Sequence, residues 1–507
     1  MPFTRSKGWI GYAGFGVLAA VAGIAAGHLV ASLLNPAASP VLAIGSTVID
    51  LTPTPMKEWA VATFGTKDKP ILVGSVLLGA LGLAALAGVL TRIRFVFGAA
   101  LLLLLVATCA VAAALRPVAE PADVVPSLAA GLVGLAALGG LTQAARVPAE
   151  ETTLGPNRRS VLLMGVAGLA WFAIGSTEAA RRITAYRTRP GQVTLPPPTS
   201  PAPQFPTGLE KRYDEITALR TPNDDFYRVD INLTVPAVAV DDWKLTIDGD
   251  VERELELDFD ELAAMSLIER DITLTCVSNE VGGKYVGGAR WLGVPLKDLL
   301  DRVGVGDGAD QILSTAVDGF TISTPLAVAL DGRDAMVAIG MNGEPLPREH
   351  GFPARLVTPG IYGYVGATKW LTKLTLTTYE AEEAYWTERD WAIDAPIKVS
   401  SRIDTPKPLA TLDPGQTVIG GIAWAQHRGI AKVEVRIDGG AWQAAKLGPS
   451  AGIDYWQQWY LPWEATSGSH MLACRATTKD GDVQTAVRAT PFPAGSSGIQ
   501  EVVVRVN

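Results

Sequence analysis

Five segments near the start of the chain are long and almost free of charged residues, and they constrain the fold more than any other feature. They lie at about residues 9 to 34, 71 to 90, 95 to 115, 124 to 145 and 160 to 177. A helix of roughly 18 or more apolar residues can cross the ~30 Å hydrocarbon layer of a membrane. One cleaved signal peptide does not explain five such segments. The sequence therefore predicts an all-α transmembrane region of five helices, an anchor that occupies residues 1–183.

Cationic residues between these segments predict their orientation. Short loops rich in Lys and Arg stay on the cytoplasmic side, and these residues gather before the first segment, between the second and third, and between the fourth and fifth. Five crossings then place the rest of the chain outside, on a multi-pass protein of the cell membrane. The pair Arg158-Arg159 is consistent with a twin-arginine export signal and equally with an ordinary cytoplasmic charge pair.

The charge balance changes sharply after the predicted anchor. The whole chain has 43 Lys and Arg against 51 Asp and Glu, a formal net charge of −8. Residues 1–207 alone carry +7, so the remaining residues carry −15. Nucleic-acid binding requires clustered cationic side chains, so an acidic C-terminal part argues against a nucleic-acid partner.

Three regions follow the anchor. Residues 184–208 include a stretch with seven prolines and no charge, which predicts an extended spacer. Residues 209–394 mix strand and helix patterns, for example strands near 243–247 and 371–376 and a helix near 296–303, which indicates an α+β domain. Residues 395–507 contain only strand patterns separated by Gly, Asp and Ser turns, which favours an all-β immunoglobulin-like sandwich.

Two stretches of the α+β region carry candidate functional residues. Cys276 ends a predicted strand and precedes a glycine-rich loop, where a thiolate could meet a ligand, although a free cysteine is more often a small buried hydrophobe. His350, Arg355 and Lys369 lie close in sequence and together suit a phosphate-bearing ligand, or form a solvated surface hairpin. The three cysteines form no CxxC or CxxCH motif, so neither a disulfide framework nor c-type haem attachment is indicated.

These stretches together resemble the sulfite oxidase superfamily of molybdopterin enzymes. The resemblance rests on TLTCVSN at residues 273–279, MNGEPLPREHGFPARLV at 341–357 and TKWL at 368–371, in the family's order and spacing. The last region is similar to the family's immunoglobulin-like dimerisation domain, in PIKVSSRI at residues 396–403 and VEVRIDGGAW at 433–442. The resemblance covers nearly all of the chain after the predicted spacer.

The resemblance implies a cofactor, a reaction and a set of site residues. Cys276 falls where the family ligates molybdenum with a thiolate, and Arg228 falls at the family's substrate site. The positions that bind molybdopterin and its phosphate correspond to Tyr227, Arg228, His350, Arg355, Ala367, Thr368 and Lys369. The implied reaction moves an oxygen atom and two electrons on a small, sulfur-containing substrate. Its electrons would pass to a separate carrier, either a cytochrome, a quinone or a membrane subunit, and the implied assembly is a homodimer.

Departures from the family pattern leave other functions open. Glu280 follows Asn279 where sulfite oxidases have arginine, and Trp391 lies where they have tyrosine. A sulfoxide reductase of the same superfamily therefore remains an alternative to a sulfite-oxidising enzyme. A non-catalytic surface binding protein with a degenerate cofactor domain is a second alternative. A cysteine hydrolase that uses Cys276 with His350 is a third.

Overall fold

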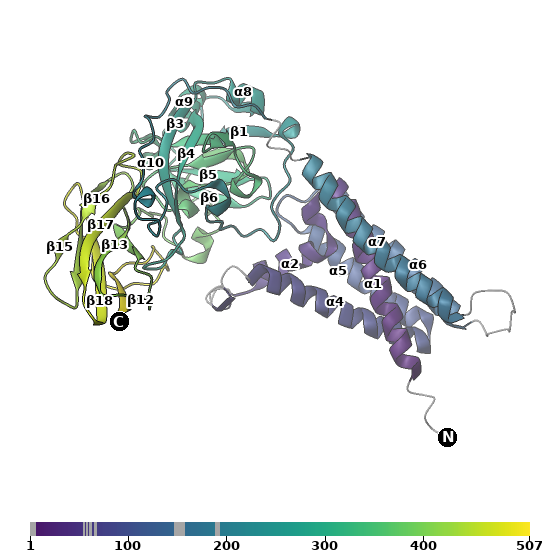
Figure 1. The fold of residues 1–507 in the computed structure, drawn as a ribbon. Coiled ribbons are helices and arrows are strands. Elements are labelled where there is room, and N and C mark those ends of the chain that lie inside the picture. The colour runs from purple at the N-terminus through teal and green to yellow at the C-terminus, as the bar shows by residue number, and fades with distance from the viewer. Residues whose placement is uncertain are drawn as a thin grey trace. The chain divides into compact units, whose positions relative to one another are not determined.

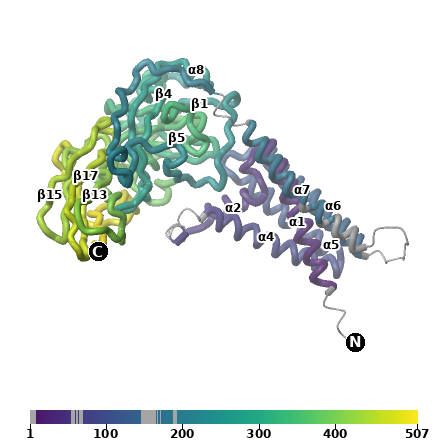
Figure 2. The backbone as a smooth tube through the Cα atoms, viewed as in Figure 1, coloured from purple at the N-terminus to yellow at the C-terminus, as the bar shows by residue number. Residues whose placement is uncertain are grey.

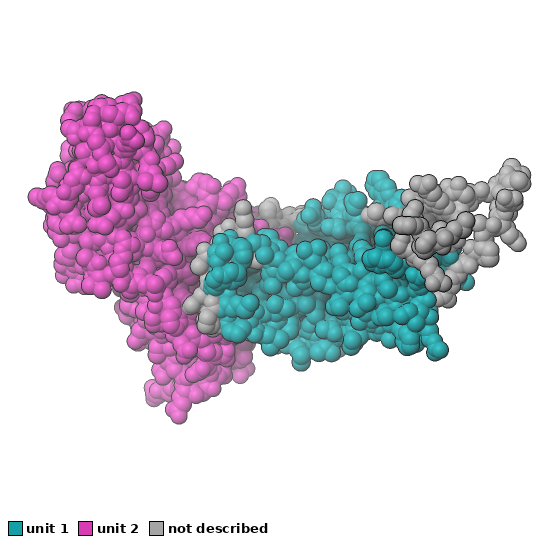
Figure 3. Space-filling model, turned by 90° about the horizontal axis from the view of Figure 1, so that it is seen from below, with its two compact units in different colours: residues 1–189, 231–237 teal, residues 190–230, 238–507 magenta. Residues whose placement is uncertain are grey.

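The computed structural model describes residues 7–53, 56, 59, 63–64, 68–146, 158–187 and 193–507. The chain divides into two compact units, drawn in different colours in Figure 3. Unit 1 comprises Met1–Arg189 together with Ile231–Ala237, and unit 2 comprises Pro190–Asp230 together with Val238–Asn507. The segment Ile231–Ala237 thus belongs to unit 1, although the residues before and after it belong to unit 2. Within unit 1, Lys69 Nζ donates a hydrogen bond to the Asn232 carbonyl at 2.8 Å.

Unit 1 is built from helices (Figure 1). Its long elements are α1 (Lys7–Leu33), α2 (Pro40–Leu51), α4 (Asp68–Ile93), α5 (Phe95–Ala114), α6 (Val125–Arg146) and α7 (Arg158–Arg187). Within the described residues, four segments are long and apolar enough to cross a membrane: Gly8–Leu33, Lys69–Ile93, Phe95–Ala114 and Pro121–Ala145. They correspond to the first four predicted spans. The coarse prediction of an apolar helical N-terminal region is therefore confirmed.

The fifth predicted span lies inside α7, and α2 was not predicted. The helix α7 covers residues 160–177, but several of its side chains, including those of Arg158 and Arg159, lie outside the described residues. The helix α2 has 12 residues, too few to cross a bilayer, and begins at Pro40, a residue that suits the first turn of a helix.

Glycines allow the helices of unit 1 to pack closely. A Cβ atom added at Gly16 of α1 would lie 1.8 Å from the Ala84 carbonyl oxygen of α4, and one added at Gly88 would lie 2.0 Å from the Tyr12 carbonyl oxygen. A Cβ atom at Gly23 would lie 2.5 Å from the Ala130 oxygen of α6. Only glycine permits these backbone approaches, which is the usual way in which helices pack where lipid removes the hydrophobic driving force.

The first part of unit 2 has two sheets with short helices, one mixed, in which β1 pairs with β10 in parallel, and one antiparallel. One sheet has the order β2-β1-β10-β5-β6, and the other has the order β3-β4-β7-β8, with β9 also paired to β7. The strands are β1 (Lys244–Gly249), β2 (Leu255–Asp258), β3 (Ile268–Thr275), β4 (Val286–Pro295), β5 (Gln311–Ala316), β6 (Thr321–Pro325), β7 (Met336–Met341), β8 (Glu344–Pro345), β9 (Arg355–Val357) and β10 (Leu371–Thr377). The helices are α8 (Phe259–Ala263), α9 (Leu296–Val303), α10 (Leu326–Leu330) and α11 (Gly363–Gly366).

Local sequence explains several of these elements. Asp258 and Glu261 form a reciprocal capping box that starts α8, each side chain accepting from the other's backbone N–H. In α9 the residues Leu296, Leu299, Leu300 and Val303 are buried, at the spacing of one helix face. The strands predicted near 243–247 and 371–376 and the helix near 296–303 are confirmed by β1, β10 and α9.

The last part of unit 2 contains two sheets packed face to face. Their orders are β11-β13-β17-β16 and β12-β19-β18-β14-β15, and Figure 2 shows β13 and β17 side by side. The strands are β11 (Ser400–Thr405), β12 (Thr411–Leu412), β13 (Gly415–Trp424), β14 (Ile430–Ile437), β15 (Gln443–Ala444), β16 (Lys446–Leu447), β17 (Gln457–Ala465), β18 (Gly468–Thr478) and β19 (Gln500–Val506). Both sheets contribute fully buried side chains, among them Ile419, Val433, Trp459 and Leu472, to one core. The C-terminal region is therefore mostly sheet, as predicted, and below we call it the sandwich.

The predicted spacer lies along unit 2 in its described part. Ser200 bridges to Ile268 of β3, while Val193 and Phe205 pack against two buried clusters of that unit. These contacts give residues 193–208 a fixed path over the sheet that contains β3.

Candidate functional site

Cys276 begins a tight loop directly after β3. Its N–H donates to the Tyr285 carbonyl at 3.0 Å, and its carbonyl accepts from the Asn279 N–H at 3.0 Å. The Asn279 side-chain oxygen in turn accepts from the Tyr285 N–H at 2.8 Å, which closes the loop on itself. The Cys276 side chain is only 8% exposed, and burial raises the pKa of its thiol. A bound metal ion would favour the thiolate at this position.

Two tyrosines lie near the cysteine. Tyr227 is partly buried, and its pKa is raised first by desolvation and then by the charge of Cys276, which places the two side chains near one another. The Phe226 ring stacks on Tyr227 at a centroid distance of 5.2 Å and meets the His350 ring edge-on at 5.4 Å. Tyr362, which was not predicted from the sequence, is also buried near Cys276, and burial raises its pKa to about 12.

His350 is a buried, neutral imidazole. Its Nε2 lies 2.9 Å from the Asn223 carbonyl oxygen, and since a carbonyl only accepts, Nε2 carries the proton. Burial lowers the His350 pKa to about 4, so the ring is uncharged at neutral pH. This leaves Nδ1 as a hydrogen-bond acceptor. His350 can therefore orient a ligand, but it supplies no positive charge for a phosphate.

Arg355 is a cation buried inside this part of the molecule. It lies on β9, is 5% exposed, and donates to the His350 carbonyl at 3.0 Å and to the Ala367 carbonyl at 3.3 Å. Its guanidinium carbon lies 5.0 Å from the centroid of the Trp291 ring. Burial lowers its pKa to about 10, and no carboxylate among the described residues offsets that cost. A buried guanidinium whose protein partners are neutral suits an anionic ligand.

Lys369 and Arg228 share one carboxylate. Lys369 Nζ lies 2.7 Å from Asp230 Oδ2. Arg228 donates hydrogen bonds to the same carboxylate from Nε at 2.7 Å and from Nη2 at 3.2 Å. Burial lowers the Lys369 pKa to about 8, although Asp230 partly opposes that shift. This part of the candidate site thus contains two cations, Arg228 and Lys369, and one anion, Asp230.

The backbone at Ala367 and Thr368 joins these groups. The Ala367 carbonyl accepts from Arg355, and the Thr368 carbonyl accepts from the Leu356 N–H at 2.8 Å, so the segment is fixed to β9. The Thr368 hydroxyl is fully buried and bonds to Ser314 at 2.5 Å.

A molybdopterin cofactor fits these residues. Among the described residues no group of three or more His, Cys, Asp and Glu side chains could hold a metal ion. A metal beside Cys276 would therefore take most of its ligands from elsewhere, as a dithiolene supplies them. The buried Arg355 and the mostly buried Lys369 offer positive charge for a phosphate, and His350 offers an acceptor for a polar ring.

The structure brings the predicted site residues into one region of unit 2, although their roles remain predictions. Sequence reasoning missed three of their neighbours: Asp230, the cation–π partner Trp291, and Tyr362. Tyr362 follows Cys276 by more than eighty residues and carries no motif that would identify it. Glu280 is exposed, and Trp391 packs against aromatic rings, those of Tyr364, Trp386 and Phe492.

Comparison with known proteins finds similarity to molybdopterin-binding oxidoreductases, among them sulfite oxidases. The family model of the oxidoreductase molybdopterin binding domain matches residues 232–386. Sulfite oxidase of Gallus gallus is 28% identical over 315 residues, which is 52% of this chain and 68% of that protein. Mitochondrial sulfite oxidase of Homo sapiens is 30% identical over 317 residues, which is 52% of this chain and 57% of that protein. The chain thus spans between about half and two thirds of these relatives.

A solved structure is similar as well. The sulfane dehydrogenase SoxCD from Paracoccus pantotrophus matches with a TM-score of 0.51 at 25% identity, over 58% of this chain and 84% of that one. The residues matched by the family model, 232–386, include Cys276, Arg355 and Lys369. The chain is therefore a molybdopterin-dependent oxidoreductase that is similar to sulfite oxidases over about half of its length.

Proposed function

We propose that this chain is a membrane-anchored, extracytoplasmic enzyme that performs two-electron oxygen-atom transfer on a small, sulfur-containing substrate. The proposal rests most directly on one observation: two cations, the buried Arg355 and the mostly buried Lys369, lie in the same region as the buried thiol of Cys276. When bound, the molybdenum cofactor supplies the redox and oxygen-transfer chemistry. The protein residues bind it, orient it and exclude water.

Each residue of the site has a proposed role. Cys276 ligates molybdenum through its thiolate, since a soft sulfur ligand suits this metal. Arg355 and Lys369 bind the cofactor phosphate, and His350 accepts a hydrogen bond at Nδ1. The Tyr227 and Arg228 side chains, together with the backbone at Ala367 and Thr368, complete the pterin pocket.

The negative charge of Asp230 beside Arg228 and Lys369 favours a substrate that carries less negative charge than sulfite. Arg228, the proposed substrate anchor, already pairs with this carboxylate in two hydrogen bonds, and Lys369 pairs with it too. A small dianion would therefore meet a partly neutralised site, and Glu280 adds a further negative side chain after Asn279.

Reduction of a sulfoxide is the candidate reaction that this charge balance favours, and oxidation of sulfite is the other. In that direction a sulfoxide takes up two protons and two electrons and yields a sulfide and water. In the other direction sulfite and water yield sulfate, two protons and two electrons. A neutral sulfoxide depends less on positive charge than a dianion does, so the partial neutralisation of Arg228 and Lys369 by Asp230 favours the reductive reaction. A non-catalytic binding protein would need neither the buried Arg355 nor Cys276.

The finer architecture is part of the proposal. Residues 1–183 would form a five-helix anchor and residues 184–208 the linker. Residues 209–394 would form the molybdopterin domain and residues 395–507 an immunoglobulin-like dimerisation domain. A separate carrier, either a cytochrome, a quinone or a membrane subunit, would exchange electrons with the enzyme. The charge bias of the loops supports an extracytoplasmic catalytic domain.

An activity screen tests the reaction. Purified, molybdenum-loaded protein is offered sulfite with an artificial electron acceptor, and methionine sulfoxide and other sulfoxides with an artificial donor. We expect turnover of a sulfoxide that Cys276→Ser abolishes. Turnover of sulfite alone would reverse the preferred direction, and an unchanged rate in a Cys276→Ser variant that retains its metal would refute the ligand assignment.

A further inference from the structure

Among the strands that the structure describes, none lies beside one edge of β3, although this strand leads directly into Cys276. β3 is the first strand of its sheet and pairs only with β4. Near its start, the segment before the first sheet covers the free edge, because the Thr199 N–H donates to the Leu267 carbonyl at 2.8 Å and the Glu269 N–H to the Ser200 carbonyl at 2.9 Å. An uncovered edge leaves backbone groups unpaired, so something must also satisfy its far end.

The sandwich covers the end that precedes the cysteine. The Thr273 N–H donates to the Asp454 carbonyl at 2.9 Å, and the Trp456 N–H donates to the Thr273 hydroxyl at 2.9 Å. The Gln426 side-chain nitrogen donates to both the Thr273 carbonyl and the Thr275 hydroxyl, each at 2.9 Å. Both backbone groups of Thr273 are thus satisfied by residues about 150 positions or more away in sequence.

Gln426 is built into a rigid turn. It lies between β13 and β14, where the Arg428 and Gly429 N–H groups both donate to the Ala425 carbonyl, and it is 1% exposed. Since a carbonyl oxygen only accepts, the Thr273 contact fixes which end of the amide faces β3. Its own oxygen is buried without a hydrogen-bond partner among the described residues. Among the described residues, the Gln426 side chain thus makes only the two hydrogen bonds that it donates to β3.

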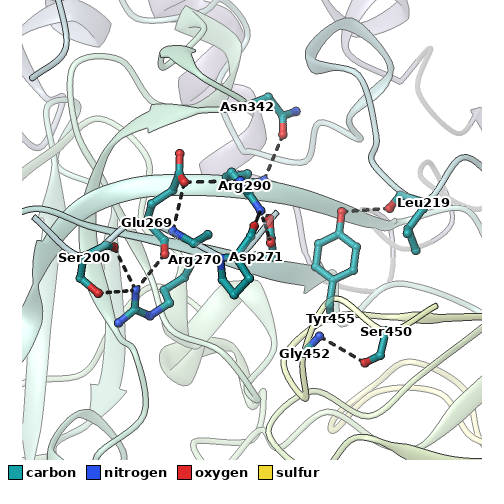
Figure 4. Close-up of polar contacts among 12 residues, drawn as sticks. Ser200, Leu219, Glu269, Arg270, Asp271, Arg290, Asn342, Ser450, Gly452 and Tyr455 are labelled. Carbon is teal, nitrogen blue, oxygen red and sulfur yellow. Dashed lines mark hydrogen bonds and ion pairs between the residues drawn. The ribbon is translucent and has the colours of Figure 1, made fainter. Parts of the chain in front are cut away.

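The sandwich also fixes the loop beyond Cys276. Ser496 Oγ donates to the Asn279 carbonyl at 2.5 Å, and Arg402 donates to the Gly283 carbonyl at 2.8 Å. Tyr455 packs against Gly288 of β4, where an added Cβ would lie 2.6 Å from the ring. Figure 4 shows Tyr455 beside this strand pair, with its hydroxyl turned to Leu219, to whose carbonyl it donates at 2.9 Å. Contacts from one domain thus hold the chain on both sides of the cysteine.

We propose that Gln426 is a positioning residue for the Cys276 sulfur, so that the sandwich sets how this thiolate meets the metal. This inference rests on the proposed ligation of molybdenum by Cys276. Groups that orient a metal ligand without touching the metal typically change metal affinity or activity by about 10- to 100-fold when they are removed. The sandwich would then act on the chemistry of the site, in addition to any part in assembly.

The test compares two buried glutamines of the same domain. Gln426→Met keeps the length of the side chain and removes the donor. Gln458→Met is the matched control, because Gln458 is fully buried and donates to Glu210 and the Thr217 carbonyl, away from β3. Both variants are studied as the full chain, well below the lower of their unfolding midpoints.

Two readouts are measured. In cofactor-free protein, mass spectrometry follows alkylation of Cys276, with the fully buried Cys474 as an internal reference. In loaded protein, the Mo(V) paramagnetic resonance spectrum and the separate kcat and KM values are recorded. We expect Gln426→Met to speed Cys276 alkylation about tenfold or more, to shift the spectrum, and to lower kcat about 10- to 100-fold with little change in KM. Gln458→Met should change none of these.

The outcomes separate this inference from the proposed function. Wild-type alkylation and spectrum in Gln426→Met, or the same changes in Gln458→Met, would overturn the positioning role. A wild-type protein without molybdenum would instead refute the proposed function. If Gln426→Met fails to fold, Thr275→Val removes one of the two acceptors, and the same tests apply with smaller expected changes.

Discussion

Lys369 is a mostly buried ammonium whose charge depends on pH near neutrality. Burial brings its pKa to about 8, while Arg355 stays protonated with a pKa near 10. The two cations proposed to bind the cofactor phosphate therefore differ in how firmly they hold their charge. Asp230 helps to keep Lys369 protonated, and Arg228 and Arg355 work against this. A bound phosphate would favour the charged form further.

Retention of the cofactor should fall as pH rises through the Lys369 pKa. Between about pH 7 and about pH 9 we expect the affinity for molybdopterin to fall about tenfold, since the empty site then holds Lys369 as a neutral amine that must take up a proton to pair with the phosphate. Lys369→Arg should flatten this dependence, because arginine keeps its charge. Release is followed by pterin fluorescence after dialysis at each pH. An equal pH dependence in wild type and Lys369→Arg would contradict the assignment.

The same lowered pKa has an opposite effect on the cofactor-free fold. An unfolded lysine titrates near about 10.4, so between about pH 8 and that value the unfolded chain holds more protons than the folded one. Burying a charged Lys369 is thus a cost that is fully present below pH 8. Between about pH 8 and about pH 10.4, the titration of Lys369 should therefore increase the free energy of unfolding of the cofactor-free protein, while cofactor binding weakens.

At the scale of elements, close helix packing in unit 1 depends on particular glycines. Gly88 of α4 faces α1, where an added Cβ would lie 2.0 Å from the Tyr12 oxygen and 2.7 Å from the Gly16 nitrogen. Gly74 lies on the same helix, and an added Cβ there would have nothing within 4 Å. Two glycines of one helix therefore differ only in whether a neighbouring backbone is close.

Replacing each glycine by alanine separates packing from helix propensity. Gly88→Ala should destabilise unit 1 by about 1 to 3 kcal/mol, because the helices must move apart. Gly74→Ala should leave stability unchanged or raise it slightly, since alanine is the better helix former. The unfolding midpoint of the detergent-solubilised protein measures both. Equal midpoints in the two variants would show that the α1–α4 approach contributes nothing to stability.

Elements were predictable from sequence where the signal is local. Long apolar segments, the α9 periodicity and the strand patterns of β1 and β10 depend on neighbouring residues only. The strand β17 was not predicted, and its Pro462 explains part of this, because proline removes a backbone donor. Pro462 is tolerated because β16 pairs only with Tyr460 and Trp459, so β17 has a free edge there.

The candidate site shows the same limit. Cys276, His350, Arg355 and Lys369 were identified because each lies in a recognisable motif. Gln426 and Tyr362 were not, because their positions near β3 and Cys276 arise from pairings across more than eighty residues. Nothing in the sequence around Gln426 distinguishes it from the other buried glutamines of the sandwich.

At the scale of the whole molecule, the two units differ in the environment they suit. Unit 1 holds the apolar helices, and the acidic residues of the chain lie mainly in unit 2. If unit 2 lies outside the cytoplasm, protease added to right-side-out vesicles should cleave it, whereas inverted vesicles should protect it. Immunoblotting with a tag after Asn507 measures both. Protection in right-side-out vesicles would contradict the proposed orientation.

The central claim is that this chain binds molybdopterin through the residues around Cys276. The most direct measurement is the molybdenum and pterin content of the full chain, purified from a host that makes the cofactor. The proposal predicts molybdenum and pterin equimolar with the wild-type chain, and a clear loss of molybdopterin in Arg355→Ala, which leaves the phosphate without its buried cation. A wild-type protein that contains neither molybdenum nor pterin would contradict it.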